Sequence, residues 1–409
     1  MKLLTPMLVM AAGLVSLTSA FAQTDDEHFY VELNAPTREI RSEIAQFIHI
    51  DRVTDDHVSA VVNKFDMAQL EKNFPELLIS REKIVTSQNG GMSTDFPDPD
   101  SAYHTYSEVV SDLQALNKKY PEQTELFVLG KTVEGKNIQG IRIFPKKTMQ
   151  ENQDQFVPGI LFVGSHHARE HLSTEVPLNL AKYLLDQQAT SDEIKNLLQN
   201  RDIYIIPVLN VDGSEFDIQD KHYKMWRKNR LNNSDGTYGV DLNRNYGFGW
   251  GTGGSSRATN SDVYMGSKPF SEPETTAFKN FVESKANIRI ILSFHTYSEL
   301  ILYPWGHKYE GIGGKDEQVF TKMAQDMAKW NKYTPEQSSA LYIASGDTCD
   351  WAYGSHGIFC FTFELSPKDS WLGGGFYPGP QMISKAFNDN IKPALYLINK
   401  AEGPYSVLE

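Results

Sequence analysis

The residues best suited to chemistry are a histidine and a glutamate three positions apart. His167 and Glu170 belong to the segment Gly-Ser-His-His-Ala-Arg-Glu, which directly follows the apolar run 160–163. Loops at the carboxyl ends of strands are where α/β proteins place their sites. An imidazole nitrogen and a carboxylate oxygen at this spacing can bind one Zn²⁺ ion and leave a position for water once a third ligand arrives. The pair alone is a weak signal, because His-x-x-Glu also arises by chance in chains rich in both residues.

Two further strand ends carry polar side chains. His295 follows the apolar run 288–294, and Glu364 ends the run 358–363. His295 offers a third ligand, although a histidine at the end of a buried strand is more often a hydrogen-bonded structural residue. Glu364 must find a partner or face a cleft, because burying an unpaired carboxylate is costly.

Cationic and amide side chains lie between these segments. Arg227 belongs to Trp-Arg-Lys, and Asn243 and Arg244 belong to Val-Asp-Leu-Asn-Arg-Asn. Arginine binds a carboxylate through two parallel hydrogen bonds, so Arg244 with Asn243 is suited to hold the terminal carboxylate of a peptide. For a lone arginine, a solvated surface loop is the simpler interpretation.

Four of these segments together resemble the zinc metallocarboxypeptidases of the pancreatic carboxypeptidase A type. They are His-Ala-Arg-Glu after a strand, Val-Asp-Leu-Asn-Arg-Asn, Ser-Phe-His-Thr-Tyr-Ser followed by Leu-Tyr-Pro, and Thr-Phe-Glu-Leu at a strand end. They follow the family's order, with similar spacings, over residues 103–398. The resemblance implies an exopeptidase that hydrolyses the C-terminal peptide bond of peptides and proteins.

The resemblance also implies a metal site. It makes His167, Glu170 and His295 the ligands of one catalytic Zn²⁺ ion, and Asp241 the carboxylate that orients the first histidine. Water bound to such a zinc ion has a pKa of about 7. Glu364 matches the general base that takes a proton as this water attacks the scissile carbonyl.

Other matches concern the substrate. Arg227 matches the arginine with which the family stabilises the developing oxyanion. Asn243 and Arg244 match its clamp for the C-terminal carboxylate. Tyr342 matches the tyrosine that closes over the substrate, and Arg169 matches a secondary residue that guides the carboxylate. The clamp requires a free carboxylate one residue beyond the attacked bond, which is why an exopeptidase results.

The pocket for the terminal side chain departs from that of the animal enzymes. The resemblance places there Leu302, Gly306, Ala344, Asp347, Cys349 and Thr362. Cys349 stands where the animal enzymes carry an apolar residue or an aspartate. Asp347 instead offers a carboxylate at the margin, which resembles the broad-specificity bacterial members of the carboxypeptidase T type. We therefore expect an apolar preference together with some cleavage of lysine or arginine ends.

Two other classes of function compete with this interpretation. A zinc amidohydrolase acting on acylated amino acids or cell-wall peptides uses the same three ligands, and a binding module that has lost catalysis lacks a ligand or the general base. All the ligands and the base are present. The clamp together with Arg227 and Tyr342 favours the enzyme that acts on peptide ends.

Strand-like and helical patterns alternate through most of the chain. Apolar runs predict strands at 138–144, 160–163, 203–208, 288–294 and 358–363, with amphipathic helices between them. A helix is also predicted from Ser271, where Glu274 and Pro273 match a capping box with a proline in the first turn. We expect an α/β domain with a mixed, mostly buried β-sheet flanked by helices, the fold of the zinc carboxypeptidases.

Three segments are predicted before this domain. Residues 1–22 combine Lys2, an apolar run and small residues, which is typical of a secretory signal peptide. Residues 23–85 alternate strand and helix patterns and resemble, in size and order, the inhibitory propeptides of the family; a permanent accessory domain is the alternative. Residues 86–100 carry no hydrophobic periodicity and are typical of a linker, which leaves 101–403 as the catalytic domain.

Composition restricts the partners and the compartment. A formal net charge of −13 over 409 residues argues against nucleic acid, because binding phosphates needs a basic surface. The first apolar run is too short for a membrane anchor, so we expect export to the medium or the periplasm. Cys349 and Cys360 are the only cysteines. A disulfide between them suits an exported chain, but sequence alone does not show that their Cβ atoms meet.

Overall fold

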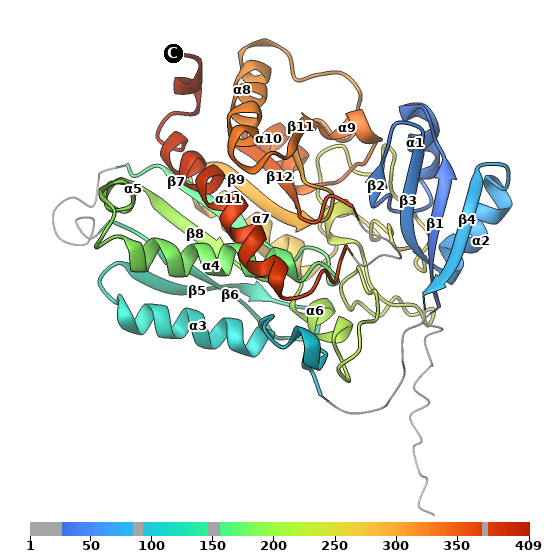
Figure 1. Ribbon diagram of the computed structural model, residues 1–409, viewed down its shortest axis with the longest axis horizontal. Helices are drawn as coiled ribbons and strands as arrows, with labels where there is room; N and C mark the ends of the chain where they lie inside the picture. The colour runs from blue at the N-terminus through green and yellow to red at the C-terminus, as the bar shows by residue number, and fades with distance from the viewer. Residues whose placement is uncertain (1–26, 85–92, 146–155, 370–374) are drawn as a thin grey trace, which may run out of the picture.

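The protein folds as a small N-terminal domain beside a much larger one (Figure 1). The computed structural model describes residues 27–84, 93–145, 156–369 and 375–409. The predicted signal peptide at 1–22 lies outside the described residues. Residues 93–100 of the predicted linker include a short 3-10 helix at Asp98–Asp100.

The N-terminal domain is an α+β unit, as its alternating pattern predicts. Its antiparallel sheet has the order β2-β3-β1-β4, formed by β1 (His28–Asn34), β2 (Arg52–Val53), β3 (His57–Asn63) and β4 (Leu78–Ile84). Thr37 and Asn63 are the N-caps of helices α1 (Arg38–Ile44) and α2 (Lys64–Asn73), and their side chains accept hydrogen bonds from amides in the first turn. Val31, Leu33 and Leu70 belong to a hydrophobic core that is separate from the core of the large domain, and Tyr342 of the large domain packs against it.

The large domain is built on a mixed sheet of eight strands in the order β11-β10-β12-β9-β7-β8-β6-β5. The strands are β5 (Thr124–Lys131), β6 (Asn137–Ile143), β7 (Gly159–Val163), β8 (Asp202–Ile206), β9 (Ile288–Thr296), β10 (Leu300–Tyr303), β11 (Thr334–Gln337) and β12 (Phe359–Leu365). The four central strands β12, β9, β7 and β8 are parallel, and β6 and β10 join them antiparallel. The predicted mixed, mostly buried sheet is confirmed.

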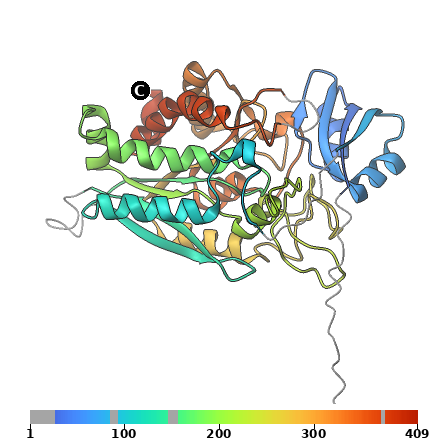
Figure 2. The same cartoon turned by 60° about the horizontal axis from the view of Figure 1, so that its bottom comes forward.

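Helices cover both faces of this sheet. They are α3 (Tyr106–Lys119), α4 (Leu172–Gln187), α5 (Asp192–Asn200), α6 (Val211–Asp217), α7 (Pro273–Ser284), α8 (Gly314–Asn331), α9 (Ser338–Leu341), α10 (Thr348–His356) and α11 (Gln381–Lys400). Helices α3, α4 and α11 lie on the near face in Figure 1, and α11 contacts both α4 and α8. Helix α7 lies behind the sheet, and Figure 2 shows the same layers from below.

The start of α7 differs from the sequence prediction. The helix begins at Pro273 with Glu272 as its extended N-cap, and its first turn has no side-chain cap from Ser271. A residue that precedes proline is disfavoured in the helical region, so the cap falls on Glu272. The Ser271 hydroxyl instead donates to the Glu272 carboxylate at 2.7 Å.

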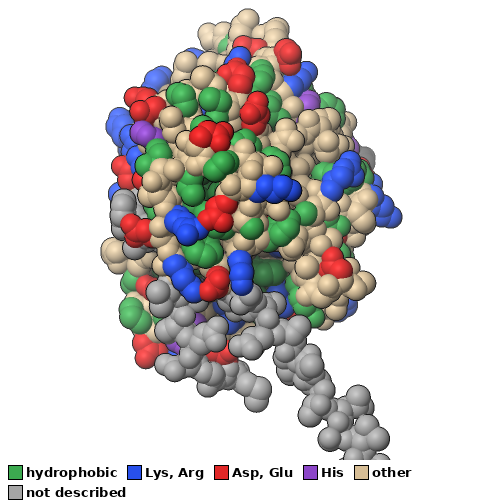
Figure 3. Space-filling view, turned by 90° about the vertical axis from the view of Figure 1, so that its right-hand side faces the viewer, with side chains coloured by type: hydrophobic (Ala, Val, Ile, Leu, Met, Phe, Trp, Pro, Cys, Tyr) green, Lys and Arg blue, Asp and Glu red, His purple; other side chains and the backbone are tan. Residues whose placement is uncertain are grey.

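The N-terminal domain covers the edge of the sheet where the parallel strands end (Figures 1 and 2). In Figure 3, which views this side of the molecule, acidic, basic and apolar side chains are interspersed rather than gathered by type. Among the described residues, no helix has both the length and the apolar character needed to cross a membrane.

Candidate active site

Three side chains converge where β7 and β9 end. His167 Nδ1 lies 2.7 Å from one carboxylate oxygen of Glu170, and His295 Nδ1 lies 3.0 Å from the other. The two Nδ1 atoms are 3.1 Å apart, and the ligand atoms of all three residues fall within 4.8 Å of one another. All three residues are buried. Two imidazoles and one carboxylate facing a common point form the donor set that binds catalytic zinc, so these residues fit one Zn²⁺ ion.

Each histidine of this group is oriented through its remote nitrogen. His167 Nε2 lies 3.2 Å from Asp241 Oδ1, and His295 Nε2 lies 3.0 Å from Ser293 Oγ. Such contacts fix the tautomer and the ring plane of a metal ligand. Asp241 is among the predicted residues and Ser293 is not. A signal for it exists, because residues two apart on a strand point to the same face, and Ser293 precedes His295 by two.

Asp241 also holds the buried Arg227. Arg227 Nε donates to Asp241 Oδ2 at 3.0 Å, and its Nη1 lies 3.8 Å from Glu170 Oε1. Burial lowers the pKa of Arg227, but the nearby Asp241 and Glu170 outweigh it and leave that pKa raised. Nη1 has no hydrogen-bond partner among the described residues. A donor held in this way is available to an oxyanion that develops near the metal position.

Glu364 lies on the strand next to the one that carries His295. Strand β12 pairs with β9 in a parallel register that places Glu364 beside His295. Burial, and then the charge of Glu170, raises the pKa of Glu364 well above its ordinary range, while Arg227 and Arg244 oppose the shift. A carboxylate with a raised pKa can both take up and return a proton, as a general base requires.

The predicted clamp residues follow Asp241 in the chain. The Asn243 amide donates to Asp241 Oδ1 at 3.0 Å, and the Asn243 side-chain oxygen accepts from both the amide and the hydroxyl of Thr348 at 2.9 Å. Arg244 donates to the carbonyl of Gly254 at 2.8 Å through Nε and to that of Asn243 at 2.9 Å through Nη1. These bonds orient a guanidinium and an amide at the wall of the cleft.

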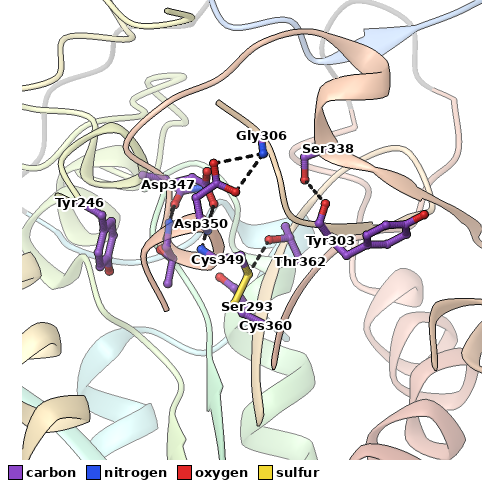
Figure 4. Close-up of a disulfide and its surroundings, with 12 residues drawn as sticks. Tyr246, Ser293, Tyr303, Gly306, Ser338, Asp347, Cys349, Asp350, Cys360 and Thr362 are labelled. Atoms are coloured by element: carbon purple, nitrogen blue, oxygen red, sulfur yellow. Dashed lines mark hydrogen bonds between the residues drawn. A yellow bond between two sulfur atoms is a disulfide. The ribbon is translucent and has the colours of Figure 1, made fainter. Parts of the chain in front are cut away.

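One cleft contains most of the predicted residues. Its lining includes His167, Arg227, Asn243, Arg244, His295, Leu302, Tyr342, Asp347, Thr362 and Glu364, together with Gly306 and Ala344. Asp241 lies behind His167. Cys349 lies behind the pocket wall, where it forms a disulfide with Cys360 and contacts Thr362 Oγ1 at 3.5 Å (Figure 4). The bond that the sequence left open is therefore present.

The N-terminal domain reaches into this cleft with residues that the sequence did not single out. The Tyr342 hydroxyl donates to the carbonyl of Ile50 at 3.0 Å, and burial raises the pKa of Tyr342 to about 12. The Ser298 hydroxyl donates to the carbonyl of Asp51 at 3.0 Å. His49 lies beside His167, with ring centroids 6.1 Å apart. A cavity of about 640 Å³ between the domains is lined by these three N-terminal residues and also by Glu364.

Arg169 lies beneath the N-terminal domain. Its Nη2 donates to Asp51 Oδ1 at 3.3 Å, and its Nη1 lies 3.9 Å from Asp262 Oδ2. The guanidinium is fully buried and stacks over the ring of Phe376 at 4.2 Å. In this arrangement Arg169 holds a carboxylate of the chain itself.

Comparisons with known proteins agree with this geometry. Residues 109–392 match the family model described as zinc carboxypeptidase. A zinc carboxypeptidase of Saccharothrix mutabilis subsp. capreolus is 36% identical over 299 residues, which cover 71% of this chain and 67% of the relative. A zinc carboxypeptidase of Simulium vittatum is 34% identical over 281 residues, 66% of this chain and 88% of the relative.

Solved structures share the fold. The carboxypeptidase A of Helicoverpa armigera superimposes with a TM-score of 0.74 at 24% identity and covers 93% of this chain and 98% of its own. Thrombin activatable fibrinolysis inhibitor superimposes with a TM-score of 0.70 at 23% identity, and the match covers 92% of this chain and 100% of that structure. Coverage above nine-tenths means that both likenesses extend into the N-terminal domain.

Proposed function

Because the chain belongs to the zinc carboxypeptidase family, whose members use one catalytic zinc ion, we propose that it is made as an exported precursor and removes single residues from the C-terminal ends of peptides. The observation that carries the proposal is the cleft in which the three-residue metal group, Glu364, Arg227 and the pair Asn243–Arg244 face one another. We assign the catalytic domain to residues 101–403.

His167, Glu170 and His295 would hold the metal. When bound, Zn²⁺ supplies Lewis acidity that polarises the scissile carbonyl and acidifies an attacking water. Glu364 takes the proton from that water and later returns it to the leaving amine, which its raised pKa favours. Arg227 stabilises the negative charge that develops on the carbonyl oxygen, because its Nη1 is buried without a competing hydrogen bond among the described residues.

Asn243 and Arg244 restrict the reaction to chain ends. A guanidinium fixed by two carbonyl groups presents its remaining donors in a set direction, and a terminal carboxylate matches that fork. Tyr342 then covers the bound substrate, and Arg169 guides the carboxylate once the N-terminal domain has left. A peptide amide offers the clamp no charge and is expected to bind poorly.

The N-terminal domain acts as an inhibitory propeptide in this proposal. It holds the Tyr342 hydroxyl through Ile50 and the Arg169 guanidinium through Asp51, so two substrate-binding side chains are occupied. The Ser42 hydroxyl also accepts from the amide of Ile343, next to Tyr342. Limited proteolysis of the folded chain within 86–100 should raise activity, whereas a permanent accessory domain predicts no gain.

Export is supported by the pattern at 1–22 and by the disulfide, since such bonds persist in oxidising compartments. The intact mass of the protein recovered outside the cytoplasm tests it, because cleavage near residue 22 removes a defined mass. A chain that keeps its first residues and stays inside the cell contradicts export.

Hydrolysis of matched blocked dipeptides tests the central assignment. The folded chain, cleaved within 86–100, should hydrolyse a peptide with a free C-terminus and leave its amide intact, and a zinc chelator should abolish the activity. Arg244→Met should lower kcat/KM for the free acid by roughly 10²–10³, because it removes charge-assisted hydrogen bonds. Lys385→Met, which changes an exposed cation on α11, is the control. Equal hydrolysis of acid and amide contradicts the clamp.

A further inference from the structure

The segment between α1 and β2 carries a histidine toward the large domain. Both neighbours of His49 are isoleucines that are buried in the core of the N-terminal domain. Strand β2 is the strand of that domain nearest the large domain (Figure 1). Two contacts hold the segment across the interface, because the Ile50 carbonyl accepts from Tyr342 and the Asp51 carbonyl accepts from Ser298, each at 3.0 Å. His49 therefore enters the cleft at a fixed place.

One ring nitrogen of His49 has no hydrogen-bond partner. Its Nδ1 is buried and makes no hydrogen bond with any described residue. Its Nε2 lies 3.6 Å from Asp51 Oδ1, and the Asp51 carboxylate is itself held by the amide of Val61 at 2.6 Å and by Arg169 at 3.3 Å. A carboxylate on this side favours the proton on Nε2. The His49 Nδ1 atom is then left as an acceptor.

The surroundings of this nitrogen suit a water molecule as its donor. A buried acceptor without a donor is costly, so a partner is expected. Arg227 and Arg244 line the same cleft as His49, and nearby cations favour the neutral, accepting form of the ring. The cleft leaves about 60 Å³ of space, which is enough for a few ordered water molecules.

His49 lies beside the metal group but outside its set of ligands. The ligand atoms of His167, Glu170 and His295 lie within 4.8 Å of one another, and His49 is not in this group. Two imidazoles that bind one zinc ion through bonds of about 2.0–2.1 Å place their ring centroids about 5 Å apart. The rings of His167 and His295 are 4.8 Å apart, whereas those of His49 and His167 are 6.1 Å apart. The additional distance leaves room for one water between His49 and the metal position.

We propose that His49 completes the metal site of the precursor: its Nδ1 accepts a hydrogen bond from the water that a catalytic zinc ion carries beside its three protein ligands. This proposal rests on the proposed carboxypeptidase activity and deepens it by naming how the N-terminal domain regulates the metal site. No proton is transferred. The water then has two acceptors, His49 and Glu364, and is held away from the path of the scissile carbonyl.

The contact couples zinc binding to docking of the N-terminal domain. Such coupling is reciprocal, so a domain that holds the water of the metal site raises the zinc affinity of the chain, and zinc in turn holds the domain in place. Replacing residues that form hydrogen bonds around a metal site typically weakens metal affinity 10- to 100-fold. Loss of the His49 contact should therefore weaken zinc binding by at least about tenfold, although the three ligands remain.

The zinc affinity of the full, uncleaved chain tests this role without an activity measurement. Competition with a chelator of known affinity gives the dissociation constant of each variant. In His49→Gln the amide nitrogen takes the place of Nε2 and no acceptor takes that of Nδ1, so zinc should bind about tenfold more weakly. In His49→Asn the side-chain oxygen takes the place of Nδ1 and should preserve most of the affinity. His57→Gln, at an exposed histidine of the same domain, is the matched control and should not change it.

Spectroscopy of the metal gives a second readout on the same full chain. X-ray absorption at zinc in the wild type should show two imidazole ligands, and three would mean that His49 binds the metal directly, which overturns the water-mediated contact. The visible absorption of the Co²⁺-substituted chain reports the groups around the metal. It should change in His49→Gln and stay as in the wild type in His57→Gln.

The outcomes separate the two proposals. A His49→Gln chain with wild-type zinc affinity, or a His49→Asn chain that binds zinc no better than His49→Gln, overturns the role of His49 and leaves the carboxypeptidase proposal intact. His49→Leu, which also lacks an acceptor, replaces His49→Gln if that variant does not fold. Absence of zinc binding by the wild-type chain, or of chelator-sensitive hydrolysis once the chain is cleaved within 86–100, overturns the carboxypeptidase proposal itself.

Discussion

Replacing Asp241 by asparagine is the most informative single perturbation of the site. One oxygen of Asp241 faces His167 Nε2 at 3.2 Å and the amide of Asn243 at 3.0 Å, and the other accepts from Arg227 Nε at 3.0 Å. Asparagine offers one acceptor and one donor group. Whichever way its amide turns, its NH₂ group faces either the histidine and the Asn243 amide or the guanidinium, all of which are donors.

The expected magnitudes follow from burial, since Asp241 and Arg227 are both nearly inaccessible. Removing one partner of a buried ion pair costs about 3–5 kcal/mol of unfolding free energy. Loss of the carboxylate behind a metal-binding histidine typically weakens metal affinity 10- to 100-fold. Every tenfold corresponds to about 1.4 kcal/mol, so zinc binding should weaken by about 1.4–2.8 kcal/mol.

Two assays separate these effects. Denaturant unfolding in the presence of a chelator gives the stability of the metal-free protein, and competition with a zinc chelator of known affinity gives the binding constant. Asp217→Asn is the matched control, because the buried Asp217 pairs with His171, which is not a ligand in our assignment. That variant should lose stability but keep its zinc affinity. An Asp241→Asn protein with unchanged zinc affinity refutes the assigned role of Asp241.

Three further predictions concern catalysis, docking and the disulfide. Glu364→Gln should lower kcat by roughly 10²–10⁴ with zinc content unchanged, since it removes the general base; a smaller loss in steady-state kinetics contradicts that role. Burial, and then Asp262, raises the pKa of Asp66 well above its ordinary value in the docked state. Docking of the N-terminal domain therefore takes up protons, is strongest below about pH 4, and weakens as pH rises toward the raised pKa values. Burial also raises the pKa of the interface residue Asp51, to about 6, so Asp66→Asn should reduce the pH dependence of inhibition by the N-terminal domain and leave the part due to Asp51; an unchanged pH profile contradicts the role of Asp66. Replacing Cys349 and Cys360 together by serine, 11 residues apart, should cost about 3 kcal/mol of unfolding free energy in denaturant titrations, and unchanged stability contradicts this.

The local sequence pattern was sufficient to predict the strands that position the proposed metal ligands and Glu364. The runs that end before His167, His295 and Glu364 are mainly apolar, with polar residues only at Arg289, Ser293 and Thr362, because central parallel strands are buried on both faces. Strands β5, β10 and β11 lie outside this parallel centre and went unpredicted, because β10 and β11 have four residues each and β5 is only partly buried.

Contacts between distant segments were not predictable from the sequence. Asp51 meets Arg169 across 118 positions, and Tyr342 meets Ile50 across 292. No periodicity encodes such pairs, since they depend on how two separately folded domains dock. The disulfide likewise required the first turn of α10 to lie against β12, which places the two Cα atoms 4.9 Å apart.

The most direct test of the whole account is the product series from one peptide. Mass spectrometry of a ten-residue peptide incubated with the cleaved, folded chain should show masses that fall by one C-terminal residue at a time, stop with a chelator, and resume when zinc is restored. Fragments from internal or N-terminal cleavage, or a series that persists without metal, contradict the account.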